Sequence, residues 1–281
     1  MKNKRAMLHV LTEYSQYSMG FVIITPEDRA IIIDGGRSLE LPNVAAHVGD
    51  RPVAAWILTH PHSDHITCIN HAMKVGHPLM EKTEKIICNF HDYDFYVQYT
   101  TEGERKPYLD FVERIKPYED RVWTPVTGDE INIDGLRIEF LFHKDEKFTE
   151  NMPNDSSLVF RVHGKKQNIL FLGDLGPIAG RELLKNHGSY LESDIVQMAH
   201  HGHMNVGMEV YAEIMPEVCL WCCPEWLYNE PDFPSYLSNT AKHFHDRRMR
   251  MYGTAVTRRW MERLGVKKHY VTKDGTQTVE L

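Results

Sequence analysis

The sequence predicts an α/β protein that folds as one domain over residues 1–281. Short apolar runs of strand length alternate with segments of helical spacing along the whole chain. No internal repeat and no linker divides the sequence, and a chain of 281 residues fits one large α/β domain. Metal-type side chains directly follow three of the apolar runs, which is where binding sites form in α/β sheets. We therefore expect one domain with a site at the strand ends.

The composition limits the possible partners. The formal net charge is −7 and the sequence pI is about 6.2, so no overall basic field would draw the chain onto nucleic acid or anionic membranes. A local basic groove remains compatible with this charge. The first residues lack the apolar segment of a secretory signal, and no apolar run reaches the length needed to span a membrane. We expect a cytoplasmic protein without a membrane partner; the sequence predicts no particular oligomeric state.

The five cysteines are expected to be reduced thiols, because their number is odd and no secretory signal is present. Cys219 and Cys222 have the C-x-x-C spacing of redox and zinc sites. They lie, however, inside the apolar run 218–223, and no second C-x-x-C occurs elsewhere. Buried strand cysteines are therefore the favoured interpretation.

The first half of the chain begins with a series of strands. The run at 30–33 is β-branched and predicts a strand that is buried on both faces. An aromatic stretch at 91–99 either lines a substrate pocket or forms a loop and helix that cover the site edge. The remaining elements are strands at 7–14, 20–25, 53–58 and 84–90, and helices at 39–49 (interrupted near Pro42), 66–75 and 108–115.

The second half predicts an antiparallel meander at 121–142, which turns at Asp134 and Gly135. A charged loop at 143–155 leads to a hairpin of strands 158–162 and 168–172. The remaining elements are helices at 178–187, 206–214 and 236–250 (the last one basic), a Pro-rich aromatic loop at 224–235, and strands at 193–199, 218–223, 249–255, 267–272 and 276–280.

Residues 59–65, THPHSDH, concentrate metal ligands after the apolar run 53–58. His60 and His62 are spaced i, i+2, so in an extended segment both rings point to one side. The neighbouring Asp64 and His65 can turn toward a second ion. Imidazole and carboxylate together suit zinc, manganese or iron. Pro61 argues against a helical metal site at this point.

Further ligand-type residues stand at other strand ends. Asp174 follows the run 168–172, and His200, His201 and His203 follow the run 193–199. Asp34, before two glycines, ends the run 30–33 and is either a residue near the site or a turn aspartate. Because strand tips in an α/β sheet converge, these segments are expected to form one site.

The pattern His-x-His-x-Asp-His after an apolar strand resembles the signature of the metallo-β-lactamase superfamily. The resemblance covers nearly the whole chain. It is closest to the hydrolase domain of the bacterial competence (DNA-uptake) channel and its free-standing relatives. It implies a four-layer αββα sandwich, which mixes α/β and α+β features. Some of these relatives are nucleases, and others cleave phosphodiesters of choline-bearing molecules. The matching segments are 33–36, 59–65, 128–131, 154–159, 172–174 and 194–202.

The resemblance implies a hydrolase with two divalent ions, zinc being the first expectation and manganese or iron the alternatives. His60 and His62 would hold one ion, Asp64 and His65 the other, and Asp174 would bridge them. Either His200 or His201 would complete the set. A metal-bound hydroxide, formed because the ions lower the pKa of water to about 7, would attack the substrate. Asp64 could orient this water.

Several other residues have expected roles around the ions. Asp34 would support the ligand loop without binding metal. His203 could protonate a leaving oxygen, although a solvated loop histidine is the favoured role. Arg37 and the basic residues at 242–250 are the cationic candidates for a phosphate substrate, with a solvated basic face favoured for the latter.

The chain departs from the wider superfamily before the strand at 158–162. Many members place there a histidine that is the third ligand of the first metal, whereas this chain has Asn154 and Asp155 followed by two serines. The missing histidine could be replaced by water, Asp155, Asn154 or the more distant His143. Asn154 and Asp155 could instead support the metal ligands.

The expected activity is hydrolysis of a phosphodiester, in a nucleic acid or a small molecule. A lactone or thioester hydrolase and a non-catalytic metal-binding regulatory protein are the alternatives. The oxygen-reducing di-iron members are disfavoured, because they need a carboxylate where His62 stands.

Overall fold

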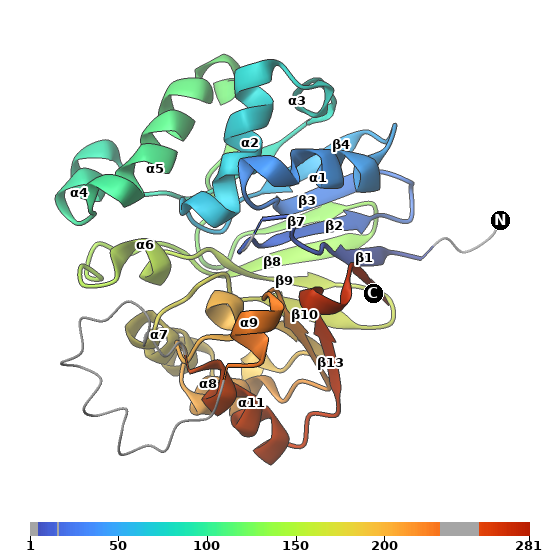
Figure 1. Cartoon of the computed structure of the whole chain (residues 1–281), viewed down its shortest axis with the longest axis vertical. Helices are drawn as coiled ribbons and strands as arrows, with labels where there is room; N and C mark the ends of the chain where they lie inside the picture. Colours follow the sequence, from blue (N-terminus) through green and yellow to red (C-terminus); the bar gives the residue numbers. More distant parts are fainter. Residues whose placement is uncertain (1–4, 16, 231–252) are drawn as a thin grey trace.

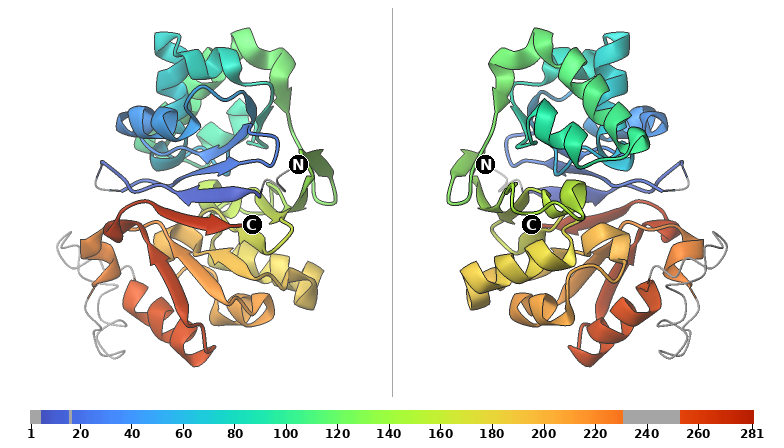
Figure 2. Two further views of the ribbon diagram at one scale, coloured as in Figure 1. Left: turned by 90° about the vertical axis from the view of Figure 1, so that its right-hand side faces the viewer. Right: turned by 90° about the vertical axis from the view of Figure 1, so that its left-hand side faces the viewer.

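The computed structural model of the chain describes residues 5–15, 17–230 and 253–281. Within this part, two seven-stranded sheets pack face to face, and helices cover the outer face of each sheet (Figure 1). The two views in Figure 2 show the same order of helices, sheet, sheet and helices. The expected α/β class and αββα arrangement are therefore confirmed. The basic helix expected at 236–250 lies outside the described residues.

The first sheet is antiparallel on one side and parallel on the other. Its strands β14, β1, β2 and β3 pair antiparallel, whereas β3, β4, β5 and β6 pair parallel. In spatial order, the strands are β14 (Gln277–Glu280), β1 (Met7–Val10), β2 (Gly20–Ile24), β3 (Ala30–Asp34), β4 (Val53–Ile57), β5 (Ile86–Ile87) and β6 (Val122–Trp123).

The second sheet repeats this mixture. Its strands β10, β11, β12 and β13 are parallel, and β7, β8, β9 and β10 are antiparallel. In spatial order, the strands are β13 (Lys268–Val271), β12 (Val218–Trp221), β11 (Ile195–Gln197), β10 (Asn168–Phe171), β9 (Val159–His163), β8 (Leu136–Phe142) and β7 (Glu130–Ile133). The hairpin expected at 158–172 is confirmed.

The helices form the two outer layers. Helices α1, α2, α3 and α5 lie against the first sheet, and α7, α8 and α11 lie against the second (Figure 1). The helices are α1 (Leu41–Val48), α2 (Ser63–Val75), α3 (Pro78–Lys82), α4 (Tyr93–Gln98), α5 (Glu102–Arg114), α6 (Met152–Asp155), α7 (Pro177–His187), α8 (Met208–Ile214), α9 (Glu225–Tyr228) and α11 (Thr254–Arg263). Short 3-10 turns are η1 (Ser38–Glu40), η2 (Lys116–Arg121), η3 (Gly188–Leu191), η4 (Ala199–Gly202) and η7 (Thr272–Asp274).

Three expected elements need correction. The meander expected at 121–142 is wrong in its first part, because β6 pairs parallel with β5 in the first sheet and only β7 and β8 form a hairpin. Pro42 does not interrupt α1 but occupies its start, where a missing N–H costs nothing. Of the strand expected at 249–255, residues 249–252 lie outside the described residues, whereas Thr254 and Ala255 belong to α11; the backbone N–H of Thr254 donates to Glu230.

The aromatic stretch at 91–99 forms a helix rather than an open loop. Tyr96 of α4 is buried and stacks on Tyr108 of α5, with ring centroids 4.0 Å apart. Helix α5 begins at Glu102, earlier than expected, because Thr101 and Glu104 form a capping box at its start. These aromatic rings therefore contribute to a small core beneath α4 and α5.

The main core lies between the sheets, and two further clusters lie beneath the outer helices. The inner cluster includes Phe21, Phe160 and Phe171, all fully buried. All five cysteines are buried and form no disulfide. None of the helices in the described residues is both long enough and apolar enough to cross a membrane. The packing of both sheets around one core brings their strand ends to a common edge.

Candidate metal centre

The candidate site lies where the carboxyl ends of parallel strands from both sheets meet. Asp34 is the last residue of β3, and His60 lies just beyond β4. From the second sheet, Asp174 lies just beyond β10, and η4, which contains His200 and His201, follows β11. Residues far apart in the sequence therefore meet, as expected for the strand ends of an α/β sheet.

The segment 59–65 is a loop only in its first part. Helix α2 begins at Ser63, so Asp64 and His65 lie in its first turn and not in the expected loop. Pro61 precedes this helix and does not disturb it. Asp64 and His65 belong to a different candidate metal group from His60 and His62, although the ring centroids of His60 and His65 lie only 4.1 Å apart.

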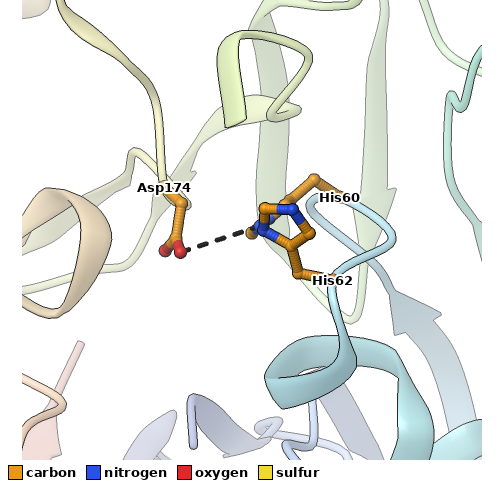
Figure 3. Close-up of side chains that lie close together, drawn as sticks. All are labelled: His60, His62 and Asp174. Carbon is orange, nitrogen blue, oxygen red and sulfur yellow. Dashed lines mark hydrogen bonds and ion pairs between the residues drawn. The ribbon is translucent and has the colours of Figure 1, made fainter. Parts of the chain in front are cut away.

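His60, His62 and Asp174 form the first group that could hold a metal ion. Figure 3 shows the two rings facing the carboxylate of Asp174 from the loop after β4. The Nε2 atom of His60 lies 3.0 Å from Nδ1 of His62 and 3.7 Å from Oδ2 of Asp174. Two nitrogens that bind one tetrahedral zinc at ordinary bond lengths lie about 3.3 Å apart. The spacing of the two rings therefore fits a shared cation.

Asp64, His65 and His201 form the second group. The Nε2 atom of His201 lies 3.7 Å from Oδ2 of Asp64 and 3.7 Å from Oδ2 of Asp174. The Nε2 atom of His65 lies 3.3 Å from the same oxygen of Asp174. Asp174 therefore faces both groups, which is the position that a bridging carboxylate requires.

Acceptors behind three of the rings orient Nε2 toward the site. His65 donates from Nδ1 to Asp34 over 2.8 Å, and His201 donates from Nδ1 to the carbonyl oxygen of Cys222 over 2.7 Å. The hydroxyl of Thr59 donates to Asp34 and therefore accepts from Nδ1 of His60, at 3.1 Å. With the proton on Nδ1, each Nε2 keeps a free lone pair, as a metal ligand needs.

Unpartnered buried atoms show that this donor set suits a cation. Nε2 of His65, Nε2 of His201 and Oδ1 of Asp174 are buried and make no hydrogen bond within the described residues. Leaving such atoms unpaired costs about 1–3 kcal/mol each. Burial alone would raise the pKa of Asp174, but the surrounding imidazoles, His65 first, hold it well below its usual range. The carboxylate is therefore ionised and faces nitrogen atoms that a divalent metal would bind.

His200 and His201 present different atoms to the site. Asn205 directs its Nδ2 group at the carbonyl oxygens of Asp174 and Leu175, which fixes the orientation of its amide. The same Nδ2 lies 2.8 Å from Nδ1 of His200, so this nitrogen accepts. A neutral His200 then carries its proton on Nε2, 3.7 Å from Asp174. His201 offers a lone pair, whereas His200 offers an N–H.

Backbone geometry places both rings at the strand tip. His200 and His201 have φ angles of 49° and 57°, in the left-handed region that L-residues rarely occupy. Gly202 follows with a φ of 88°, and an added Cβ would lie 2.5 Å from the ring of Trp221. Since Trp221 is fully buried, its ring cannot withdraw without disturbing the core.

Replacing Gly202 by alanine is expected to lower the free energy of unfolding by about 2–4 kcal/mol, since backbone strain adds to overpacking against Trp221. Urea denaturation of the metal-depleted chain would measure this loss. Gly275→Ala is the matched control: it has a φ of 94° but no atom within 4 Å of the added Cβ. An equal loss in both variants would contradict a role for the Trp221 contact.

The other expected site residues lie in different surroundings. Arg37 is beside the second group: its Nη2 lies 3.8 Å from Asp64, while Nε and Nη1 donate to the Tyr17 carbonyl oxygen and to Ser63. His203 lies 3.0 Å from the hydroxyl of Tyr17 through Nε2. Burial, aided by the neighbouring imidazoles, lowers the pKa of His203 to about 2, so the ring is neutral at pH 7.

None of the three substitutes for the absent third histidine belongs to a metal group within the part of the chain that the structure describes. Asp155 faces the start of α7, where it accepts from the backbone N–H of Ala179, and burial raises its pKa to about 6. Asn154 donates to Asn151, and its buried Oδ1 has no hydrogen-bond partner in the described part of the chain. His143 accepts instead from Thr127, in a cavity of about 440 Å³.

Sequence reasoning missed several residues that contact the site. The ring of Tyr17 lies 4.0 Å from that of His201, and Asn205 and the Cys222 carbonyl oxygen orient the 200–201 pair. Glu104 of α5 lies 3.8 Å from Nε2 of His62. Only Glu104 carried a signal, because the Thr-x-x-Glu spacing predicts a capping box, although not its proximity to His62.

The sequence matches one family description, "Metallo-beta-lactamase superfamily", over residues 18–205. This region covers more than half of the chain and includes every ligand candidate of the two groups. No curated protein matches the sequence.

Solved structures of low sequence identity share the fold. The metallo-beta-lactamase fold protein YhfI from Bacillus subtilis is 13% identical, with a TM-score of 0.53 that covers 98% of this chain and 99% of that one. CmlA, a diiron β-hydroxylase from Streptomyces venezuelae, is 11% identical with a TM-score of 0.56; the match covers 99% of this chain and 54% of that one. This chain thus spans about half the length of CmlA. At these identities, the likeness establishes the architecture and nothing finer.

Proposed function

Since the chain belongs to the metallo-beta-lactamase superfamily, most of whose members are hydrolases, we propose that it is a metal-dependent hydrolase of phosphodiesters. The substrate would be a nucleic acid or a small phosphodiester. The observation that carries the proposal is the position of Asp174, which faces both the His60–His62 pair and the Asp64–His65–His201 group. Two divalent cations bound there, zinc first and manganese or iron as alternatives, would supply Lewis acidity and lower the pKa of a water.

The protein's own residues supply the remaining functions. Asp64 orients the attacking water, as an acceptor at the edge of the second group. His200, whose side chain is 22% exposed, donates from Nε2 to a non-bridging oxygen of the substrate phosphate. Arg37 supplies a positive charge nearby, and its bonds to Tyr17 and Ser63 hold the guanidinium in place. His203, which is neutral, positions Tyr17 at the rim of the site.

We also propose a relationship to one subgroup of the superfamily. The segments at 128–131, 154–159 and 194–202 support a kinship with the hydrolase domain of the bacterial competence channel and its free-standing relatives. That kinship favours phosphodiesters over lactams. The lack of a third histidine beside His60 and His62 is compatible with it, because the same feature occurs in that subgroup.

Elemental analysis of the purified chain, followed by a substrate panel with added manganese or zinc, tests the proposal. The panel contains bis-p-nitrophenyl phosphate, a nitrocefin-type lactam and a thioester. We expect hydrolysis of the phosphodiester alone, lost on chelation and restored by metal. Turnover of the thioester instead would indicate the alternative hydrolase, and bound metal without any turnover would indicate a regulatory protein.

A further inference from the structure

His62 differs from the other rings of the site in what lies behind it. His60, His65 and His201 each have a hydrogen-bonding acceptor on the nitrogen that points away from the site. Nε2 of His62 is buried and makes no hydrogen bond with any residue that the structure describes. Among the described residues, the one carboxylate within 4.0 Å of it is Glu104, whose Oε1 lies 3.8 Å away.

The neighbouring ring determines which nitrogen of His62 faces the metal position. Nδ1 of His62 lies 3.0 Å from Nε2 of His60, and His60 carries its proton on the opposite nitrogen. Without an ion, this distance fits a hydrogen bond from Nδ1–H of His62 to Nε2 of His60; an ion bound by both nitrogens would take the place of that proton. If His62 offers Nδ1 to an ion, its own proton must lie on Nε2, on the side of Glu104.

We propose that Glu104 is the positioning residue of the first metal position. Its carboxylate accepts from Nε2–H of His62 and so holds Nδ1 toward the ion. The proposal rests on the metal centre described above and adds to it a residue of α5. Carboxylates that accept from the outer nitrogen of a metal-binding histidine fix the orientation of the ring and strengthen the ligand.

The capping box of α5 prepares Glu104 for this role. Oε2 accepts from the backbone N–H of Thr101 over 2.8 Å and from its hydroxyl over 2.6 Å, which leaves Oε1 for His62. The side chain of Asn70 in α2 donates to the carbonyl oxygen of Pro107 in α5 over 2.9 Å, so the two helices are joined. The Glu104 side chain is 38% exposed, and a small rotation would shorten the 3.8 Å separation to a hydrogen bond.

The first metal group of this chain has few ligands, so the orientation of each ligand matters. The first group has two histidines and the shared Asp174 where many relatives have a third histidine. With fewer ligands, the affinity for the ion depends more strongly on how well each ring is held. Glu104 would contribute to metal retention without contacting the metal.

The test is zinc titration of the full metal-depleted chain against a competing chromophoric chelator. The wild-type chain is expected to bind two equivalents. In Glu104→Ala, the affinity for one equivalent should fall by about 10–100-fold while that for the other is unchanged. Glu104→Gln retains a neutral acceptor for Thr101 and His62, so it keeps the helix cap and should lie between the two.

Glu113→Ala is the matched control. It removes a carboxylate of the same helix that pairs with Lys116 and belongs to neither metal group, so zinc affinity should stay within about twofold of wild type. Two tightly bound equivalents in Glu104→Ala, with wild-type affinities, would overturn the positioning role alone. A wild-type chain that binds no zinc would overturn the metal centre, and the positioning role with it.

Discussion

Replacing Asp174 by alanine should remove both metal ions and nearly all hydrolysis. Asp174 is fully enclosed, and its Oδ2 faces nitrogens of His60, His65 and His201 at 3.3–3.7 Å. Asp174 is the negative charge that faces both metal groups. Without its carboxylate, no charge shared by the two groups would offset the repulsion between two cations bound there. The loss of several kcal/mol of transition-state stabilisation corresponds to about a thousand-fold or more in kcat.

Elemental analysis and the rate with bis-p-nitrophenyl phosphate would measure this effect. Asp134→Ala is a suitable control, because Asp134 pairs with Arg29 and belongs to neither metal group. The control should keep its metal and its activity. Full activity of Asp174→Ala after metal depletion would refute the two-ion site.

Alanine at His201 and at His200 should produce different defects. His201 offers a free Nε2 to the second group, so His201→Ala should lose one equivalent of metal and, with it, activity. His200 offers an N–H, so His200→Ala should keep both equivalents and lose about 10²–10³ in kcat, as when one hydrogen-bond donor to a transition state is removed.

Metal content measured beside kcat and KM separates the two variants. His200→Gln is the informative companion, because its amide can donate in place of Nε2–H and should recover part of kcat. Loss of metal from His200→Ala together with full retention in His201→Ala would reverse the assignment of the two histidines.

The sequence predicted well those features that depend on the residues of one short segment. The apolar runs at 30–33 and 53–58 predict buried strands because β-branched residues favour that environment, and both strands occur. The density of ligands in 59–65 predicted a metal site with candidates on three strand ends. The structure brings together the candidates His60, His62, Asp64, His65, Asp174 and His201 in two groups.

Other features depended on contacts between segments distant in sequence. The short strand β6 carries no pattern that distinguishes an edge of the first sheet from the meander that follows it. Helix α11 begins at Thr254 through a contact with Glu230, which no local pattern predicts. The strands within 121–142 were recognised but not their sheet partners, because pairing is decided by burial against other elements. The helix Thr254–Arg263 was not predicted from the sequence.

By itself, the sequence determined the kinds of ligand and the strand ends that carry them. This is because residue type and spacing within one segment set the available donor atoms and the side to which they point. Only the tertiary structure distinguishes the surroundings of His200 from those of His201, because Asn205 and the Cys222 carbonyl oxygen contact different rings. It also brought Glu104 from α5 to His62, a contact between separate helices that no single stretch of sequence encodes.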